Sequence, residues 1–174
     1  MAIQPGSILR GHYRIDALVG GGGMALVYRA FDLNLQRVCA IKQNLDSSPE
    51  AQQQFYVEAI VLANLSHPHL ARVTDHFVDT TGQQYLVMDF VEGEDLASVV
   101  KRQGQIPAVQ AQEWIGQVAD ALNYLHNRQP PAGDRDLHAF FRKRLGDSPA
   151  NARAAARDEC CFACESIRHE DSLN

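Results

Sequence analysis

The sequence lacks both the long apolar runs of a membrane protein and the excess of basic residues that is typical of nucleic-acid-binding proteins. No apolar stretch reaches the roughly 20 residues that a helix needs to cross a bilayer. The formal net charge of −5 argues against bulk binding to nucleic acids. The first residues also lack the basic start and the apolar run of a signal peptide. We therefore expect a cytoplasmic, globular protein with no membrane segment and no nucleic-acid partner.

Cysteine is also scarce, with four residues in a chain of 174. Cys39 stands alone in a strand-like segment, whereas Cys160, Cys161 and Cys164 cluster near the end of the sequence. This spacing is not a disulfide framework, and it fits a reducing compartment. The cluster and His169 together supply up to four metal ligands, but a single Cys-x-x-Cys pair is only half of a zinc site. We expect free thiols in this segment and no bound metal.

The residues that are present form a succession of strand-like and helix-like segments. Strands are predicted where β-branched and aromatic residues gather between turn signals, at residues 8–20, 25–31, 36–43, 71–78 and 84–91. The turn signal Asp79-Thr80-Thr81-Gly82 predicts a hairpin of the last two strands. Helices are predicted at 48–65, at 96–101 and after Pro107, the last with Trp114, Val118, Leu122 and Leu125 on one face. This order indicates an α+β fold with an antiparallel sheet.

The helix predicted at residues 48–65 carries a charged residue on its apolar face. It starts with an N-cap serine, Ser48, followed by a proline. Its inner face consists of residues at helical spacing, namely Phe55, Ala59, Leu62 and Leu65. Glu58 falls within this face, and a buried carboxylate requires a nearby cation, for which Lys42 is the obvious candidate. The alternative is a rotated helix in which Glu58 is solvated.

A run of four glycines, Gly20 to Gly23, lies between the first two predicted strands. Glycine lets the backbone approach a ligand closely, and the N–H groups of such a loop can bind phosphates. On this motif alone, a flexible hairpin without a ligand is an equally good interpretation. Lys42 favours phosphate binding, because a lysine within an apolar strand is costly to bury unless an anion pairs with it. The alternative for Lys42 is an exposed position on its strand.

Further motifs accompany the glycine run in a fixed order. The complete set is Val19-Gly20-x-Gly22-x-Met24-Ala25-x-Val27, Ala40-Ile41-Lys42, Glu58, His67-Pro68-His69-Leu70, Met88-Asp89-Phe90-Val91-Glu92-Gly93 and Leu122-x-Tyr124-Leu125-His126. Over residues 10–131 this set resembles the bacterial, eukaryotic-like serine/threonine protein kinases. The resemblance implies a nucleotide-binding lobe at about 10–91, with a twisted antiparallel sheet and one packed helix. A hinge and the first helices of a second lobe would follow at about 92–128.

The resemblance also implies an ATP site and Mg²⁺ as a cofactor. The residues that it would place around ATP are Val19, Gly20, Gly21, Gly22, Gly23, Val27, Ala40, Lys42, Met88, Asp89, Val91 and Asp95. The glycine amides would cover the phosphates. Lys42 would bind the α- and β-phosphates, and Glu58 would hold Lys42 in place. By resemblance, both Lys42 and Glu58 therefore belong to the catalytic machinery.

The remaining residues of this set would surround the nucleoside. Adenine would lie between four apolar side chains, those of Val19, Val27, Ala40 and Met88. The backbone of Asp89 and Val91 would bind the edge of the base, and Glu92 or Asp95 would reach the ribose. One departure from the family pattern is Ala25, which stands where a third glycine is usual and would stiffen the loop.

The resemblance weakens where the family has its catalytic loop. Aligned without a gap from Pro130-Pro131, the sequence reads Asp134-Arg135-Asp136-Leu137-His138-Ala139-Phe140-Phe141. Asp136 falls on the position of the catalytic aspartate, but Phe141 stands in place of the asparagine that binds Mg²⁺, and no Asp-Phe-Gly follows. Because phosphoryl transfer depends on the bound metal, we expect impaired catalysis. We also expect residues 132–174 to form a divergent, disordered tail.

Three interpretations of the chain remain open at this point. The first is a truncated product of a kinase gene whose reading frame is disrupted after about residue 137, where the family pattern stops abruptly. The second is a pseudokinase that binds a nucleotide or a partner through the same lobe. The third is an interaction module that kept the fold without binding nucleotide. ATP is the expected ligand in the first two, and the sequence identifies no protein substrate.

Overall fold

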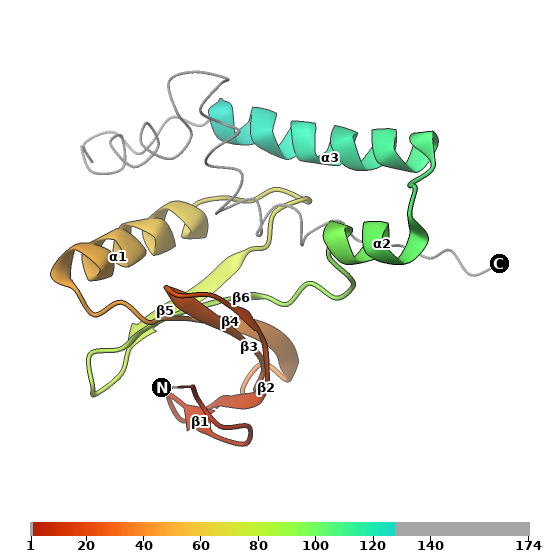
Figure 1. Ribbon diagram of the computed structural model, residues 1–174. Coiled ribbons are helices and arrows are strands. Elements are labelled where there is room, and N and C mark those ends of the chain that lie inside the picture. Colours follow the sequence, from red (N-terminus) through yellow and green to blue (C-terminus); the bar gives the residue numbers. More distant parts are fainter. Residues whose placement is uncertain (1, 128–174) are drawn as a thin grey trace. The chain divides into compact units, whose positions relative to one another are not determined.

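The computed structural model describes residues 2–127. The predicted tail at 132–174 and Asp136 lie outside these residues, so what we expect of them stays a prediction. The described chain divides into two compact units, the first with residues 2–65 and 72–90 and the second with residues 66–71 and 91–127. The first unit holds a sheet and one helix, and the second holds two helices (Figure 1). No described helix is both long enough and apolar enough to cross a membrane.

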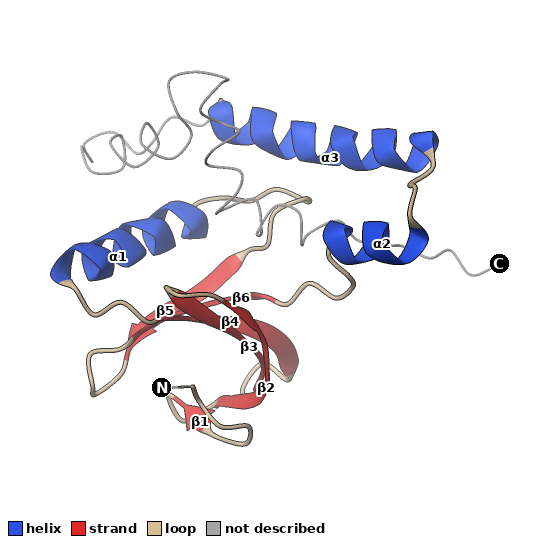
Figure 2. Cartoon of the chain, in the orientation of Figure 1, coloured by secondary structure: helices blue, strands red, loops and turns tan. Residues whose placement is uncertain are grey.

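The first unit is built on a single antiparallel sheet of six strands. The strands are β1 (Ile8–Leu9), β2 (Tyr13–Gly21), β3 (Ala25–Asp32), β4 (Arg37–Asn44), β5 (Val73–Val78) and β6 (Gln84–Asp89). Their spatial order is β1-β2-β3-β4-β6-β5, and every neighbouring pair is antiparallel. The sheet is strongly curled, as Figure 2 shows. The predicted α+β class with an antiparallel sheet is therefore confirmed.

Tight turns separate β1 from β2 and β5 from β6. The segment predicted as one strand at 8–20 is two strands, because Arg10 and Gly11 turn the chain with φ angles of 46° and 77°. The hairpin between β5 and β6 turns at Asp79, as the turn signal predicted. Its carboxylate accepts hydrogen bonds from the N–H groups of Thr81 and Gln83 at 2.8 and 3.0 Å. Such Asx contacts stabilise a tight connection between two strands.

The core of the first unit lies on one side of the curled sheet. Its buried residues are Tyr13, Ile15, Tyr28, Ala30, Cys39, Ile41, Phe77, Tyr85 and Val87. Ile41 is opposite both Tyr28 and Val87, and opposite residues of antiparallel strands project to the same side. The Tyr28 hydroxyl donates to Gln43 Oε1 at 2.9 Å and accepts from the Ile3 N–H at 3.0 Å. These hydrogen bonds satisfy the buried hydroxyl of Tyr28.

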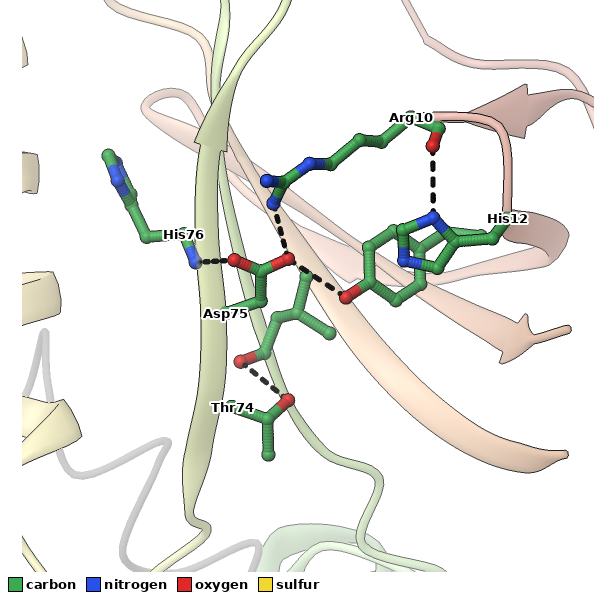
Figure 3. Close-up of polar contacts among 7 residues, drawn as sticks. Arg10, His12, Thr74, Asp75 and His76 are labelled. Atoms are coloured by element: carbon green, nitrogen blue, oxygen red, sulfur yellow. Dashed lines mark hydrogen bonds and ion pairs between the residues drawn. The ribbon is translucent and has the colours of Figure 1, made fainter. Parts of the chain in front are cut away.

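Asp75 joins two distant strands of the sheet, as Figure 3 shows. Its Oδ2 atom lies 2.6 Å from Arg10 Nη1 and accepts a hydrogen bond from the Tyr13 hydroxyl at 3.0 Å. The Tyr13 ring also stacks on Phe77, with 5.8 Å between the ring centroids. Arg10 follows β1, and Asp75 lies in β5, at the other end of the strand order. These contacts therefore close the curl of the sheet.

Helix α1 (Pro49–Ala63) begins as predicted. The Ser48 side chain accepts a hydrogen bond from the Ala51 N–H at 3.3 Å, which caps the first turn. The helix ends at Ala63, slightly earlier than the predicted end at Leu65. Leu62, predicted on the inner face, is only half-buried. The buried residues of the helix are Phe55, Val57, Glu58, Ala59 and Val61.

The second unit contains α2 (Leu96–Gln103) and α3 (Ala108–His126). Helix α3 buries Trp114 and Ala121. Leu122, predicted to share one face of this helix with Trp114, is 38% exposed. Successive helical residues are rotated by about 100°, and Ala121 takes the inward position in place of its neighbour.

The short segment 66–71 belongs to the second unit although it directly follows α1 and Leu65 in the sequence. The Ser66 N–H donates a hydrogen bond to the Tyr124 hydroxyl at 2.9 Å. The rings of His67 and Tyr124 are in contact, with 4.9 Å between their centroids. His67 Nε2 also lies 3.3 Å from Asp120 Oδ2. The segment is therefore attached to α3 through two turns of that helix.

Candidate functional site

Lys42 lies in β4 on the side of the sheet that faces away from the core. Its opposite residues are Val27 in β3 and Leu86 in β6. Ile41, its neighbour, belongs to the core, and successive residues of a strand point to opposite sides. The Lys42 side chain is only 14% exposed. An ammonium group in such surroundings needs an anionic partner.

Glu58 of α1 is a partner of Lys42. Its Oε1 atom lies 2.8 Å from Lys42 Nζ, and the Glu58 side chain is 10% exposed. Lys42 Nζ also lies 5.5 Å from the centroid of the Phe55 ring, one turn earlier in the helix. The ion pair expected from the helical spacing is present, and a solvated Glu58 is not observed. Helix and sheet are thus joined by a desolvated pair of charges.

The glycine run forms the connection between β2 and β3. Gly20 and Gly21 pair with residues of β3. The Gly22 N–H is used within the hairpin, because it donates to the Ala25 carbonyl oxygen at 2.9 Å. Among the described residues, nothing accepts a hydrogen bond from the N–H of Gly23, at the tip. The amide that is open to a ligand is therefore the one at Gly23 rather than the one at Gly22.

Packing against neighbouring protein atoms explains why a glycine is needed at only one of the four positions. A Cβ atom at Gly21 would lie 2.6 Å from Leu26 Cδ2 and 3.0 Å from the Ala25 carbonyl oxygen. A Cβ atom at any of the other three glycines would meet no atom within 4 Å. Their small size is therefore not required by the neighbouring protein atoms. It is consistent with close approach of a ligand to the loop.

Three of the four side chains expected around adenine share the side of the sheet on which Lys42 lies. Val27 is opposite Lys42, Ala40 lies two residues before Lys42, and Met88 is opposite Ala40. Ala40 and Met88 are buried, and Val27 is half-buried. The fourth, Val19, lies at a register shift of β2 and is exposed. The sheet thus places a small apolar surface directly beside the ammonium group.

The residues expected to bind the edge of the base and the ribose belong to different units. Asp89 is the last residue of β6 in the first unit, whereas Val91 and Asp95 belong to the second. Asp95 is the N-cap of α2, since Oδ1 accepts from the Ser98 N–H at 2.9 Å and Oδ2 from the Ser98 hydroxyl at 2.8 Å. These hydrogen bonds lower the pKa of the Asp95 carboxyl group. An aspartate directly before a helix is a cap signal that our sequence analysis did not use.

Two arginines beside Asp89 were also not expected from the sequence. Arg37 Nη1 lies 3.3 Å from Asp89 Oδ1, and Arg72 Nε lies 3.8 Å from Asp89 Oδ2. No local motif signals these contacts, because they depend on the register in which β4 and β6 pair. In that register Cys39 is opposite Asp89, which brings the start of β4 to the end of β6.

The residues that align with the family's catalytic loop lie outside the described part of the chain. Asp136, at the position of the catalytic aspartate, lies outside the described residues, as does Phe141. Within residues 2–127, no three metal-ligating side chains gather into a group that could hold an ion. The described part of the site therefore consists of the glycine loop, the Lys42–Glu58 pair and the apolar surface beside it.

Comparison with known proteins yields matches that cover the same region. A model of the protein kinase domain matches residues 13–137. Serine/threonine-protein kinase PknA of Mycobacterium tuberculosis is 36% identical over 133 residues, covering 72% of this chain and 31% of the relative. Serine/threonine-protein kinase PknE of Mycobacterium bovis is 35% identical over 119 residues, covering 67% of this chain and 21% of the relative. The chain thus spans less than a third of the length of either kinase.

A solved structure described as the apo form of PpkA-294 has the same fold. It superposes with a TM-score of 0.64 at 24% sequence identity, covering 72% of this chain and 52% of the other. The glycine run, Lys42 and Glu58 all lie within the residues that the kinase model matches. That match extends over more than half of the sequence. The chain therefore belongs to the protein kinase domain family.

Proposed function

We propose that this chain binds ATP and that it is the nucleotide-binding part of a bacterial serine/threonine protein kinase. The observation that carries the proposal is the ion pair of Lys42 and Glu58, with 2.8 Å between Nζ and Oε1. Protein kinases use a lysine of the sheet to bind the α- and β-phosphates, and a glutamate of the helix that follows that strand holds the lysine in place. The pair gives the ammonium group one fixed position, which favours a ligand whose phosphates reach that position.

The neighbouring residues fit an adenine nucleotide. The open amide of Gly23 suits a phosphate oxygen, because N–H groups of glycine loops bind anions. The apolar surface of Val27, Ala40 and Met88 suits the flat face of a base. Bound ATP would supply the phosphoryl group, and the described residues would hold and orient it. Mg²⁺ is expected with ATP in this family, and its family ligand positions lie beyond the described residues.

We further propose that the chain transfers phosphoryl groups poorly or not at all. This proposal is supported by residues 134–141, in which His138 and Phe141 occupy the positions of a lysine and of the Mg²⁺-binding asparagine. The side chain of a phenylalanine cannot ligate Mg²⁺, because it has no donor atom. The disrupted reading frame and the pseudokinase are both compatible with such a site. The second of these would bind a nucleotide or a partner without catalysis.

We place the protein in the cytoplasm. ATP is the proposed ligand, and the cytoplasm is where a bacterial kinase domain meets it. Cys39 is a buried free cysteine, which also fits a reducing compartment. The proposed protein partners are a substrate or a binding partner, and neither is identified by the described residues.

Thermal unfolding with and without Mg-ATP tests nucleotide binding. A ligand at 100 times its Kd should add about 2.7 kcal/mol to the free energy of unfolding. We expect Lys42→Met to lose this stabilisation. Lys101→Met, which removes an exposed lysine of α2, is the matched control and should keep it. If the wild type gains no stability from Mg-ATP, the proposed function is wrong and the interaction module becomes the better interpretation.

A second measurement addresses catalysis. Transfer of the γ-phosphate from ATP to a generic protein substrate should stay at background in the wild-type chain. Phe141→Asn restores the family residue at one Mg²⁺ position and serves as the comparison. Turnover of the wild type at a rate typical of kinases, about 1–100 per second, would contradict the proposed impairment.

A further inference from the structure

The carboxylate of Asp89 lies between two arginines that come from different parts of the sheet. Arg37, the first residue of β4, places Nη1 3.3 Å from Oδ1. Arg72, directly before β5, places Nε 3.8 Å from Oδ2. The backbone is held as well, because the Asp89 N–H donates to the Arg72 carbonyl oxygen at 3.0 Å. We call this arrangement the Asp89 bridge.

The Asp89 bridge fixes the point at which β6 ends. Asp89 is the last residue of β6 that pairs with β4, where it is opposite Cys39. The next residue, Phe90, lies beneath the Arg29 guanidinium, with 5.7 Å from Cζ to the ring centroid. Met88, whose side chain belongs to the proposed adenine surface, directly precedes Asp89. The end of β6 is therefore held at the edge of the proposed base site.

Stability alone does not explain the Asp89 bridge. Its side chains are one third to three fifths exposed, and exposed ion pairs contribute little to the free energy of folding. The geometry also has a cost, because Arg37 Nε is buried and has no hydrogen-bond partner among the described residues. A buried polar atom that stays unsatisfied next to a proposed ligand site is a sign of a constraint on function.

We propose that Arg37 and Arg72 are positioning residues for adenine. Through the Asp89 carboxylate they hold the Asp89 peptide in the orientation that binds the edge of the base. Neither arginine needs to touch the nucleotide. The inference rests on the proposed function, since it concerns the same ATP site. We infer in addition that side chains on the core side of the sheet determine the selectivity for the base, whereas Lys42 lies on the opposite side.

Competition against a fluorescent ATP analogue tests the Asp89 bridge. Kd is measured for ATP and for GTP, which share the ribose and phosphates and differ at the edge of the base. We expect Asp89→Asn and Arg37→Gln to raise the Kd for ATP by roughly two- to fivefold, the range for an exposed ion pair. The Kd for GTP should stay unchanged, so the ATP preference falls. Asp89→Glu keeps the negative charge, so this variant should keep most of the preference for ATP over GTP.

Two further variants separate positioning from general damage. Arg14→Gln removes another arginine–aspartate pair of the sheet, with 3.0 Å between Arg14 Nε and Asp16 Oδ1, and should leave both Kd values unchanged. Arg72→Gln alters the more exposed arginine of the bridge, so it should fold even if Asp89→Asn does not. An equal rise of both Kd values, or no rise for ATP, would overturn the inference. A wild type that binds no ATP would instead overturn the proposed function, and the inference with it.

Discussion

Lys42 Nζ and Glu58 Oε1 lie 2.8 Å apart and join strand β4 to helix α1. The Lys42 side chain is 14% exposed and the Glu58 side chain is 10% exposed. Among the described ion pairs without histidine, every other side chain is more exposed than these two. Moving two charges out of water is costly, and this cost is offset only while both partners are present. The same pair holds the ammonium group that we propose for phosphate binding.

Glu58→Ala should therefore destabilise the protein. Removing one partner of a buried ion pair costs about 3 kcal/mol, and Lys42 would lose the carboxylate that lies 2.8 Å from its ammonium group. Denaturant unfolding of the wild type and the variant measures this difference. The ATP-dependent gain in stability should disappear in the same variant, since Lys42 then loses the group that positions it.

The double variant Lys42→Met with Glu58→Leu is the control for this prediction. Replacing both charges by apolar side chains of similar volume is often neutral for stability. We expect it to unfold within about 1 kcal/mol of the wild type and to show no stabilisation by ATP. A double variant that is less stable than Glu58→Ala would show that the charges do not act as a pair.

Alanine substitutions in the glycine run should have two different effects. Gly21→Ala should lower the free energy of unfolding by about 1–3 kcal/mol, because the new Cβ meets Leu26 Cδ2 at 2.6 Å. Gly23→Ala adds a methyl group in open space, so its stability should be close to that of the wild type. Its affinity for ATP should nevertheless fall, since the methyl group stands beside the open amide. Isothermal titration and denaturant unfolding of both variants test this contrast, and equal effects on stability would contradict it.

Substitution of Asp95 separates its role as the N-cap of α2 from its proposed role in ribose binding. Asparagine caps a helix about as well as aspartate, whereas alanine does not. Asp95→Asn should therefore keep the stability of the wild type, and Asp95→Ala should lose about 1 kcal/mol. If Asp95 also binds the ribose, Asp95→Asn weakens ATP binding without a loss of stability. Unchanged ATP affinity in Asp95→Asn would restrict this residue to capping α2.

Because of His76, the free energy of unfolding of the first unit should be lower at mildly acidic pH than at neutral pH. Burial lowers the pKa of His76 below its ordinary value of 6.5, although Asp75 acts in the opposite direction. Nε2 is buried and has no hydrogen-bond partner among the described residues. Below pH 6.5 the unfolded chain therefore binds the proton more readily than the folded protein does. The free energy of unfolding should decrease as the pH falls from 7.5 to 5.5.

The variant His76→Gln tests this assignment, because glutamine does not titrate. Its free energy of unfolding should change less than that of the wild type over the same pH range. The rings of Phe55 and Tyr56 lie 6.1 and 5.6 Å from the His76 ring, so the substitution also alters packing. The comparison is therefore made between the two pH profiles rather than between absolute stabilities. Parallel profiles would show that another group is responsible.

Local sequence patterns were sufficient to predict the Lys42–Glu58 pair. Glu58 was expected on the inner face of its helix because the apolar residues around it repeat every three or four positions. Lys42 was expected in a strand because β-branched and apolar residues precede it. Each pattern depends on neighbours within one element, so both could be read directly from the sequence. The same patterns predicted the antiparallel sheet and the hairpin at Asp79.

Contacts between distant elements could not be predicted in this way. Asp75 joins β5 to Arg10 and Tyr13, and Asp89 meets Arg37, because the sheet curls and pairs its strands in one particular register. Both the curl and the register result from the packing of side chains that lie far apart in the sequence. The exposure of Leu122 is of the same kind, since helical spacing defines a stripe but not its exact rotation. Sequence periodicity thus specified most of the elements and an apolar stripe on each helix, whereas tertiary packing specified which part of a stripe is buried and which charged groups meet across the sheet.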